Sequence, residues 1–405
     1  MSRHHRHGLI GTLLLAVIYG CAEPSTSPSQ SAVEPPSVEE SLRQQFENAQ
    51  PGDVIVVPAG KHEVRRPLVL NTDGVTVRGS GMAESILSFA NQIAGAEGIL
   101  VNASNFTIED LAIEDSIGDA LKINEGQNIT VRRVRTEWTN GPDTENGAYG
   151  IYPVLTENTL IDGAIAIGAS DAGIYVGQSK NVIVKNSRAA YNVAGIEIEN
   201  TVHADVFDNL AEHNTGGILV FNMPDIAMTG HSTRVFNNRM VNNNTANFGA
   251  AGTAVAGVPA GSGLVINAND GVQIFDNVFA NNNTAHVLIS SYFSASFAGQ
   301  LELAEGFDPY PERILIRNNQ FGDGGGAPDR EQLEQVRISV FGAEGALPAI
   351  VWDGVAPEDR AAQICVQADV KLLNIDAGNN GANLTQDMSR HNCELEPLAA
   401  VSLGR

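Results

Sequence analysis

Four residues recur at one position of a repeated sequence pattern and could together carry acid–base chemistry. Lys122, Tyr152, Tyr175 and Glu197 each stand two positions after the first residue of a copy. A lyase or epimerase acting on a uronic acid needs a positive charge to neutralise the sugar carboxylate, together with a base and an acid. Lys122 can supply the charge, and the other three can exchange protons. These four residues are therefore our candidate catalytic residues.

Other polar residues nearby are candidate substrate ligands. Asn124 and Glu199 stand two positions further along their copies, Asp171 stands two residues before a copy, and Trp138 opens an insertion where its ring could face a sugar. A shallow groove long enough for a short oligosaccharide is expected along this face. The alternative is that these polar residues have no function beyond keeping an exposed face of the protein solvated.

Two further readings of the acidic residues remain open. Glu197 and Glu199 lie at i and i+2 of one expected strand, about 6.6 Å apart by strand rise, which is compatible with the carboxylate pair of an inverting hydrolase. Calcium could bridge Asp171, Glu197 and Glu199, but the sequence holds no EF-hand-like run. We therefore expect neither a metal nor a cofactor.

A repeat of 22 residues positions all of these side chains. The phrase Gly-Ile-Tyr-Val at Gly173 returns as Gly-Ile-Glu-Ile at Gly195 and as Gly-Ile-Leu-Val at Gly217. Each copy is a short Val- and Ile-rich run bounded by Gly, Asn and Asp, which is typical of strands and turns. Because so short a strand cannot bury its inner face alone, the copies must stack in parallel. The leucine-rich repeat has a similar period, but its leucine frame is missing.

The repeat predicts an all-β fold, a single-stranded right-handed parallel β-helix, in which successive copies bring the candidate residues onto adjacent rungs about 4.8 Å apart. Insertions at 138–147 and 221–261 should loop out on the working face. The recurring asparagines at 192, 214, 242–244 and 281–283 are expected to stack their amides along the axis.

The order of segments suggests a leader, a tether, a solenoid and a cap. Residues 1–21 form a basic and then apolar leader, and residues 22–36 a Pro/Ser-rich tether. The solenoid is expected over 37–322. It begins with a helix that Ser37 caps, whose Leu42 and Phe46 cover the first coil. Residues 323–405 are expected to form an irregular C-terminal cap with a short helix at 329–335.

Charge and cysteines restrict the possible partners and location. A formal net charge of −23 argues against nucleic acid as a partner, because no basic stripe offsets it. Ile18-Tyr-Gly-Cys21 resembles a bacterial lipobox, which implies lipidation at Cys21, and Ala22 after it implies delivery to the outer membrane. An ordinary cleaved secretory peptide is the alternative. In an exported protein Cys365 and Cys393 are expected to form a disulfide, the alternative being two free thiols.

Several longer phrases carry a family resemblance. WTNGP…ENGAYGIYPV, DAGIYVGQS and YNVAGIEIEN, together with the lipobox, resemble a family of bacterial exported parallel β-helix repeat lipoproteins, over about Pro51 to Asn319. The entry phrases PGDVIVVPAG and GVTVRGSG are similar to those of the pectate-lyase-like superfamily. The family resemblance implies no catalytic residues. It implies a possible cytochrome c-like exported protein as a partner.

Two functional hypotheses follow. The first is a carbohydrate-active protein, lyase- or epimerase-like, that acts on a periplasmic or cell-surface polysaccharide. The DPHD motif of mannuronan epimerases and the paired aspartates of polygalacturonases are absent from the sequence. The second is a non-catalytic scaffold that binds glycan or the cytochrome c-like partner at the cell envelope.

Overall fold

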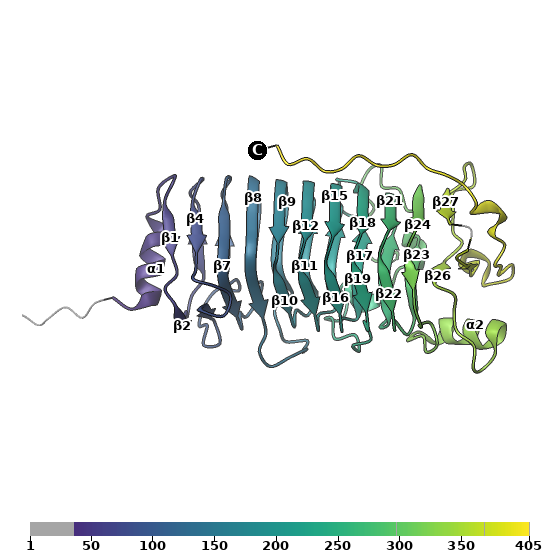
Figure 1. Ribbon diagram of the computed structural model, residues 1–405, viewed down its shortest axis with the longest axis horizontal. Coiled ribbons are helices and arrows are strands. Elements are labelled where there is room, and N and C mark those ends of the chain that lie inside the picture. Colours follow the sequence, from purple (N-terminus) through teal and green to yellow (C-terminus); the bar gives the residue numbers. More distant parts are fainter. Residues whose placement is uncertain (1–35, 297, 368, 405) are drawn as a thin grey trace, which may run out of the picture. The chain divides into compact units, whose positions relative to one another are not determined.

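The computed structural model describes residues 36–296, 298–367 and 369–404, and the predicted leader with nearly all of the tether lies outside these ranges. Residues 37 onward form one compact unit. Its strands stack in parallel into a β-helix, as the repeat predicts (Figure 1). Each complete coil has three strands, so the solenoid has three parallel sheets.

The first sheet carries the candidate residues and is called the site sheet. Its strands, in stacking order, are β3 (Leu68–Leu70), β6 (Ile99–Val101), β8 (Leu121–Glu137), β9 (Tyr149–Asp162), β11 (Ala172–Gly177), β14 (Ala194–Glu199), β17 (Gly216–Phe221), β20 (Ser262–Asn267), β23 (Ala285–Ser290), β26 (Ile350–Trp352) and β28 (Leu372–Asn374). Strands β8 and β9 are long enough to continue around the bend.

The second sheet contains β1 (Val54–Val56), β4 (Thr76–Arg78), β7 (Thr107–Glu114), the middle of β8, the end of β9, β12 (Lys180–Lys185), β15 (Val202–Phe207), β18 (His231–Phe236), β21 (Asp270–Phe275), β24 (Ile314–Arg317) and β27 (Ile364–Val366). The third contains β2 (Gly60–Glu63), β5 (Ser85–Ser88), the ends of β7 and β8, β10 (Ile165–Ile167), β13 (Arg188–Ala190), β16 (Leu210–Glu212), β19 (Arg239–Val241), β22 (Val278–Ala280) and β25 (Gln320–Phe321).

Buried aliphatic side chains fill the interior, and two asparagine ladders line its turns. Asn192 Nδ2 donates to Asn214 Oδ1 over 3.0 Å, and the ladder continues through Asn243 to Asn282. A second ladder runs from Asn209 to Asn319 through the intervening coils. The predicted axial stacking of asparagine amides is therefore confirmed at Asn192, Asn214, Asn243 and Asn282, whereas the second ladder was not predicted. Both ladders satisfy buried polar groups at the turns.

Helix α1 (Val38–Glu47) closes the first coil as expected. Ser37 Oγ accepts a hydrogen bond from the Glu40 backbone N–H at 3.2 Å, and Leu42 and Phe46 are buried. In the described part of the chain, no helix is long and apolar enough to cross a membrane.

The C-terminal region differs from the prediction, because coils continue beyond residue 322. Strands β26, β27 and β28 pair in parallel with β23, β24 and β26. Helix α2 (Glu331–Phe341) lies in a loop before β26, where residues 329–335 were expected to be helical. The loop lengthens the interval between strands, which hides these coils from a search for a 22-residue period.

Short 3-10 helices lie in the loops: η1 (Val255–Gly257), η2 (Tyr292–Ser294), η3 (Ala377–Asn379) and η4 (Met388–Arg390). The disulfide between Cys365 and Cys393 is confirmed and joins β27 to the final segment. That segment then runs back across the second sheet (Figure 1). Gln273 donates to the Glu396 carbonyl at 2.8 Å, and the Val401 N–H donates to Asp205 at 3.1 Å.

Candidate functional site

Long loops are attached to both ends of strands in the site sheet. Residues 222–230 and 291–313 follow β17 and β23, whereas residues 242–261 and 322–349 precede β20 and β26. The predicted insertion 221–261 is therefore two loops separated by β18 and β19, and the two later loops were not predicted. Val255 and Val258 of the second loop pack in one apolar cluster with Tyr175, Leu219 and Phe221. The insertions thus cover part of this face instead of leaving it open.

The four candidate catalytic residues stand on successive rungs of this sheet. Lys122 pairs with Tyr152, and Tyr175 pairs with Glu197. The pairing of Ile151 with Ile174 sets Tyr152 beside Tyr175, and their ring centroids are 4.9 Å apart. Lys122 Nζ lies 4.9 Å from the centroid of the Tyr152 ring. The expected alignment along one face is confirmed.

The expected exposure of this ladder is wrong at its centre. Lys122 and Tyr152 are half-buried, but only 4% of Tyr175 and 2% of Glu197 are exposed. Gly177 was expected to leave open space beside Glu199, yet the Tyr175 ring fills that space. A Cβ at position 177 would lie 2.3 Å from Tyr175 Oη. The glycine therefore lets Tyr175 reach across to Glu199, whose Oε1 accepts its hydroxyl at 2.6 Å.

Three buried carboxyl groups lie together at this place: Asp171, Glu197 and Glu199. Burial, which disfavours the charged form, raises the pKa of all three, and their mutual repulsion raises the pKa of Asp171 and Glu197 further. Within the described residues, Asp171 Oδ1 and Glu197 Oε2 are buried without a hydrogen-bond partner. Unpaired buried carboxylate oxygens cost folding free energy and are expected mainly where a function retains them.

Tyr149 completes the cluster, although the sequence analysis did not select it. Its ring centroid lies 4.4 Å from that of Tyr152 and 4.7 Å from that of Tyr175. It also hydrogen-bonds Asp171, which lowers the pKa of that carboxyl group. The repeat contains a signal that could have identified Tyr149. Tyr149 pairs with Ala172 of β11, and Ala172 pairs with Ala194 of β14, so the three residues occupy the same position of successive copies. A large aromatic residue thus stands where neighbouring copies have alanine.

Asp119, also not selected, borders the cluster on the side of Lys122. The Lys122 Nζ lies 3.7 Å from Asp119 Oδ2. Burial raises the pKa of Asp119 to about 6, and Lys122 opposes this rise. Burial likewise raises the pKa of Tyr152 to about 12. We call Asp119, Lys122, Tyr149, Tyr152, Asp171, Tyr175, Glu197 and Glu199 the tyrosine–carboxylate cluster.

Two predicted substrate ligands lie outside the cluster. Trp138 was expected to offer its ring to a sugar, and this is wrong because only 5% of it is exposed. Its indole N–H donates to the Ser116 carbonyl at 2.8 Å, and its ring belongs to the interior core. Asn124 lies on the site sheet, where its Nδ2 is 3.5 Å from Asn102 Oδ1. Asn124 therefore extends an outer asparagine ladder that does not reach Glu199.

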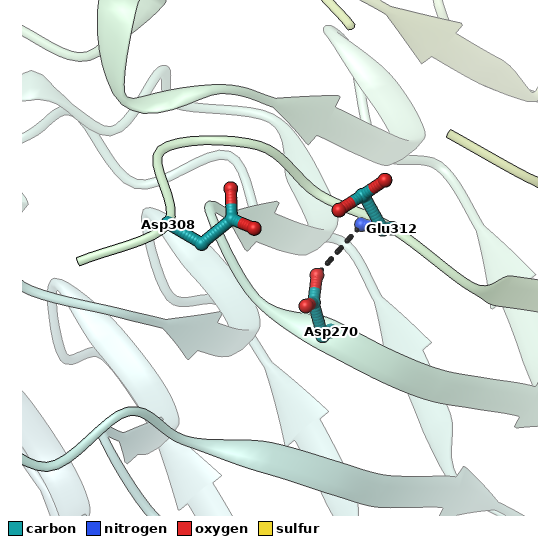
Figure 2. Close-up of side chains that lie close together, drawn as sticks. All are labelled: Asp270, Asp308 and Glu312. Carbon is teal, nitrogen blue, oxygen red and sulfur yellow. Dashed lines mark hydrogen bonds between the residues drawn. The ribbon is translucent and has the colours of Figure 1, made fainter. Parts of the chain in front are cut away.

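Among the described residues, the carboxylates of Asp270, Asp308 and Glu312 form the one group of three potential metal ligands whose atoms all lie within 4.8 Å of one another. Figure 2 shows them converging, with Asp270 accepting from the Glu312 backbone N–H at 2.9 Å. Arg360 already donates to Asp308 at 2.7 Å and to Glu312 at 2.6 Å. The guanidinium group thus supplies the positive charge here. Asp171, Glu197 and Glu199, where calcium was the alternative, do not form such a group in the described part of the chain.

A cavity of 520 Å³ lies further along the site sheet. Strands β17, β20, β23 and β26 contribute Phe221, Asn267, Ser290 and Val351 to its lining, and the loops at 254–259 and 294–296 with the start of helix α2 at 330–333 form its walls. Because Glu199 pairs with Phe221, the cavity begins one rung beyond the tyrosine–carboxylate cluster.

Comparisons with known proteins agree with this architecture. A family model described as "Right handed beta helix region" matches residues 98–301. No curated protein sequence matches the chain. Among solved structures, the A-module of the mannuronan C-5 epimerase AlgE4 from Azotobacter vinelandii has a TM-score of 0.51 at 18% identity, covering 78% of this chain and 86% of that module.

Two other solved structures are similar at lower scores. The catalytic unit of an α-1,3-glucanase from Streptomyces thermodiastaticus has a TM-score of 0.49 at 13% identity, covering 78% of this chain and 48% of that one. A family 28 exopolygalacturonase from Yersinia enterocolitica has a TM-score of 0.45 at 13% identity, covering 70% of this chain and 62% of that one.

Proposed function

The chain belongs to the right-handed β-helix family, and we propose that it is a carbohydrate-active enzyme that acts on a polysaccharide by a lyase- or epimerase-like reaction at the tyrosine–carboxylate cluster. One observation carries the proposal. Three tyrosines in mutual ring contact adjoin three buried carboxyl groups of raised pKa, and two of these groups keep an unpartnered oxygen among the described residues. Burial raises the pKa of Asp171 to about 8 and that of Glu199 to about 7, and carboxyl groups that titrate near neutrality suit general acid–base chemistry.

The burial pattern supports a division of roles. Four residues of the cluster keep part of their side chains exposed and are the groups that would contact a sugar: Asp119, Lys122, Tyr149 and Tyr152. Lys122 would share its charge between Asp119 and a substrate carboxylate. With a pKa raised to about 12, Tyr152 stays protonated at neutral pH and would donate a proton rather than accept one.

The base would then be Asp119, the cluster carboxylate that is only half-buried and whose pKa of about 6 leaves it ionised at neutral pH. In either reaction it removes the proton from the sugar carbon next to the carboxyl group, and Lys122 stabilises the negative charge that forms on that carboxyl group. An epimerase returns a proton to the opposite face of the same carbon. A lyase instead breaks the adjacent carbon–oxygen bond, and an acid protonates the departing oxygen. Tyr175 and its bonded partner Glu199 would pass protons between Tyr152 and the buried acids.

One fold relative, with a TM-score of 0.51, is a mannuronan C-5 epimerase module. At 18% identity the likeness concerns the fold, so the assignment rests on the cluster and not on the relative. The inverting hydrolase alternative would use Glu197 and Glu199 alone. It gives no role to Lys122 or to the three tyrosines.

The test is a screen of the purified protein against uronate polymers. New absorbance from unsaturated products would identify a lyase, and changed uronate stereochemistry in NMR spectra would identify an epimerase. Glu197→Gln and Tyr175→Phe should abolish turnover, while the matched control Glu125→Gln, an exposed carboxylate on β8, should retain it. Glycan binding without turnover in any assay would support the non-catalytic scaffold instead.

Location and partner are part of the same proposal. We propose that a lipid on Cys21 holds the protein at the outer membrane, in the cell envelope, where a polysaccharide substrate is accessible. The lipobox-like sequence supports the anchor. The cytochrome c-like exported partner is proposed from the family resemblance alone. Co-purification from solubilised membranes would test it.

A further inference from the structure

The outer face of the site sheet is open over its first four rungs and covered over the rest. On β3, β6, β8 and β9 the central outward residues are half-buried: Val69, Leu100, Lys122 and Tyr152. From β11 onward the residues at the same position are buried: Tyr175, Glu197, Leu219, Val265, Leu288 and Val351. The boundary between the open and the covered rungs therefore lies between β9 and β11.

A long loop and a helix form the cover. Val258 of the loop before β20 belongs to the apolar cluster that contains Tyr175 and Leu219. Leu333 of helix α2 packs against the same cluster. The segments before β20 and β26 run over residues 242–261 and 322–349, whereas only residues 115–120 join β7 to β8. A polymer lying along the axis on the open rungs would meet this cover directly beyond Tyr152 and could not continue.

An exposed asparagine ladder runs beside the open rungs. Asn102 Nδ2 donates to Asn71 Oδ1 at 2.8 Å, and Asn124 Nδ2 lies 3.5 Å from Asn102 Oδ1. Asn71 and Asn102 are exposed, and Asn124 is half-buried. Because an amide side chain has two donor hydrogens and an acceptor oxygen, each keeps hydrogen-bonding capacity for a ligand. The same group recurs about every 4.8 Å along the axis, which suits a polymer of similar units.

The column next to this ladder is aliphatic at its far end. Val69 and Leu100 pair across β3 and β6, and Lys122 and Tyr152 follow on the next two rungs. A sugar residue presents both C–H groups and hydroxyl groups, so a surface of aliphatic side chains with a few placed amides fits it. The open column spans three rung spacings, or about 14 Å, and ends at the exposed part of the tyrosine–carboxylate cluster.

We propose that the protein acts on the end of a polysaccharide chain, with the terminal sugar at Lys122 and Tyr152 and the rest of the chain lying along β6 and β3. The inference rests on the proposed function, because it specifies how the substrate of that site lies. The burial of Tyr175 and Glu197 leaves no surface for a sugar beyond the reacting one. Terminal residues should therefore react, and internal residues should not.

The number of protein molecules that bind each chain tests this inference without requiring turnover. The probes for calorimetric titration are mannuronate and galacturonate oligomers of two, six, twelve and twenty-four residues. Should the unmodified protein degrade them, Glu197→Gln is titrated instead. We expect one protein to bind each chain at every length. Affinity should rise from the dimer to the hexamer and then stay constant, because longer chains extend beyond the open rungs.

Two variants report on the path of the chain. Asn71→Ala removes the most distant amide of the ladder and should weaken hexamer binding about fivefold, while the dimer, which does not reach β3, should bind unchanged. Leu100→Glu places a negative charge under the chain and should weaken hexamer binding at least about tenfold. Gln44→Ala, which removes an exposed amide from helix α1, is the matched control and should bind as the unmodified protein does.

Failure of the chain-end inference and failure of the proposed enzyme give different results. Several proteins on each twenty-four-residue chain, or products of mixed length early in a digestion, would overturn the chain-end inference and leave the enzyme standing. Hexamer binding undiminished in both variants would overturn the path along β6 and β3. One protein per chain without turnover of any uronate polymer would overturn the enzyme and leave chain-end binding standing. Neither binding nor turnover with any probe would overturn both.

Discussion

Replacing Glu199 by glutamine should make the protein more stable in mild alkali. Glutamine keeps the shape of the side chain, and its amide oxygen can still accept from the Tyr175 hydroxyl, which lies 2.6 Å from Glu199 Oε1. The substitution removes only the ability to ionise. Burial raises the pKa of Glu199 from 4.5 to about 7, while the hydrogen bond from Tyr175 lowers it.

The sign of the effect follows from this raised pKa. A group whose folded pKa exceeds its unfolded pKa stabilises the fold fully below about pH 4.5, and that contribution is lost as the pH rises through about 7. At about 1.4 kcal/mol for each pH unit, the ionised carboxylate costs about 3 kcal/mol above pH 7. Glutamine avoids this cost. The variant should therefore match the unmodified protein at pH 4.5 and exceed its stability by up to about 3 kcal/mol at pH 8.

Urea unfolding followed by circular dichroism at pH 4.5, 6, 7 and 8, at constant ionic strength, measures this difference. Glu125→Gln is the control, since an exposed substitution should change stability by less than about 0.5 kcal/mol at every pH. A Glu199→Gln protein that is no more stable than the original at pH 8 would refute the inference that burial destabilises this carboxylate. A Glu199→Gln protein that is more stable but less active than the original would indicate that the carboxylate is retained for catalysis.

Four other perturbations test separate parts of the structure. Gly177→Ala should lower the free energy of unfolding by about 1–3 kcal/mol, since the new Cβ would lie 2.3 Å from Tyr175 Oη. An equal loss in a Tyr175→Ala background would contradict this clash. Tyr175→Phe should fold normally but raise the pKa of Glu199, seen by NMR titration, because the lowering hydrogen bond is gone; an unmoved titration would argue against that bond. Cys365→Ser should lower stability by about 2–5 kcal/mol, as should reduction of the unmodified protein, and unaltered urea midpoints in both would count against the disulfide. Cys21→Ser should move the protein from the membrane to the soluble periplasmic fraction, and unchanged fractionation would remove the lipid anchor.

The sequence by itself determined the coils and the rung on which each candidate residue stands. Parallel strands joined through backbone hydrogen bonds keep equivalent residues in register, so a period of 22 residues sets Tyr175 beside Glu197 without further information. The same periodicity placed Asn192 and Asn214 in one ladder. Local signals also sufficed for the cap helix, where the Ser37 hydroxyl satisfies a free N–H.

Only the tertiary structure decided which faces of those rungs are buried. The repeat cannot reveal that Tyr175 folds over Gly177, because the direction of one side chain depends on the space that its neighbours leave. Loops without a period supply the apolar cover and the cavity walls, since their packing depends on contacts between residues distant in sequence. Trp138 likewise reads as a surface aromatic in its insertion, yet its ring packs in the core and its indole N–H donates to the Ser116 carbonyl, a contact between coils that spacing does not reveal. Burial, not spacing, raised the pKa of the acidic residues and made the tyrosine–carboxylate cluster recognisable.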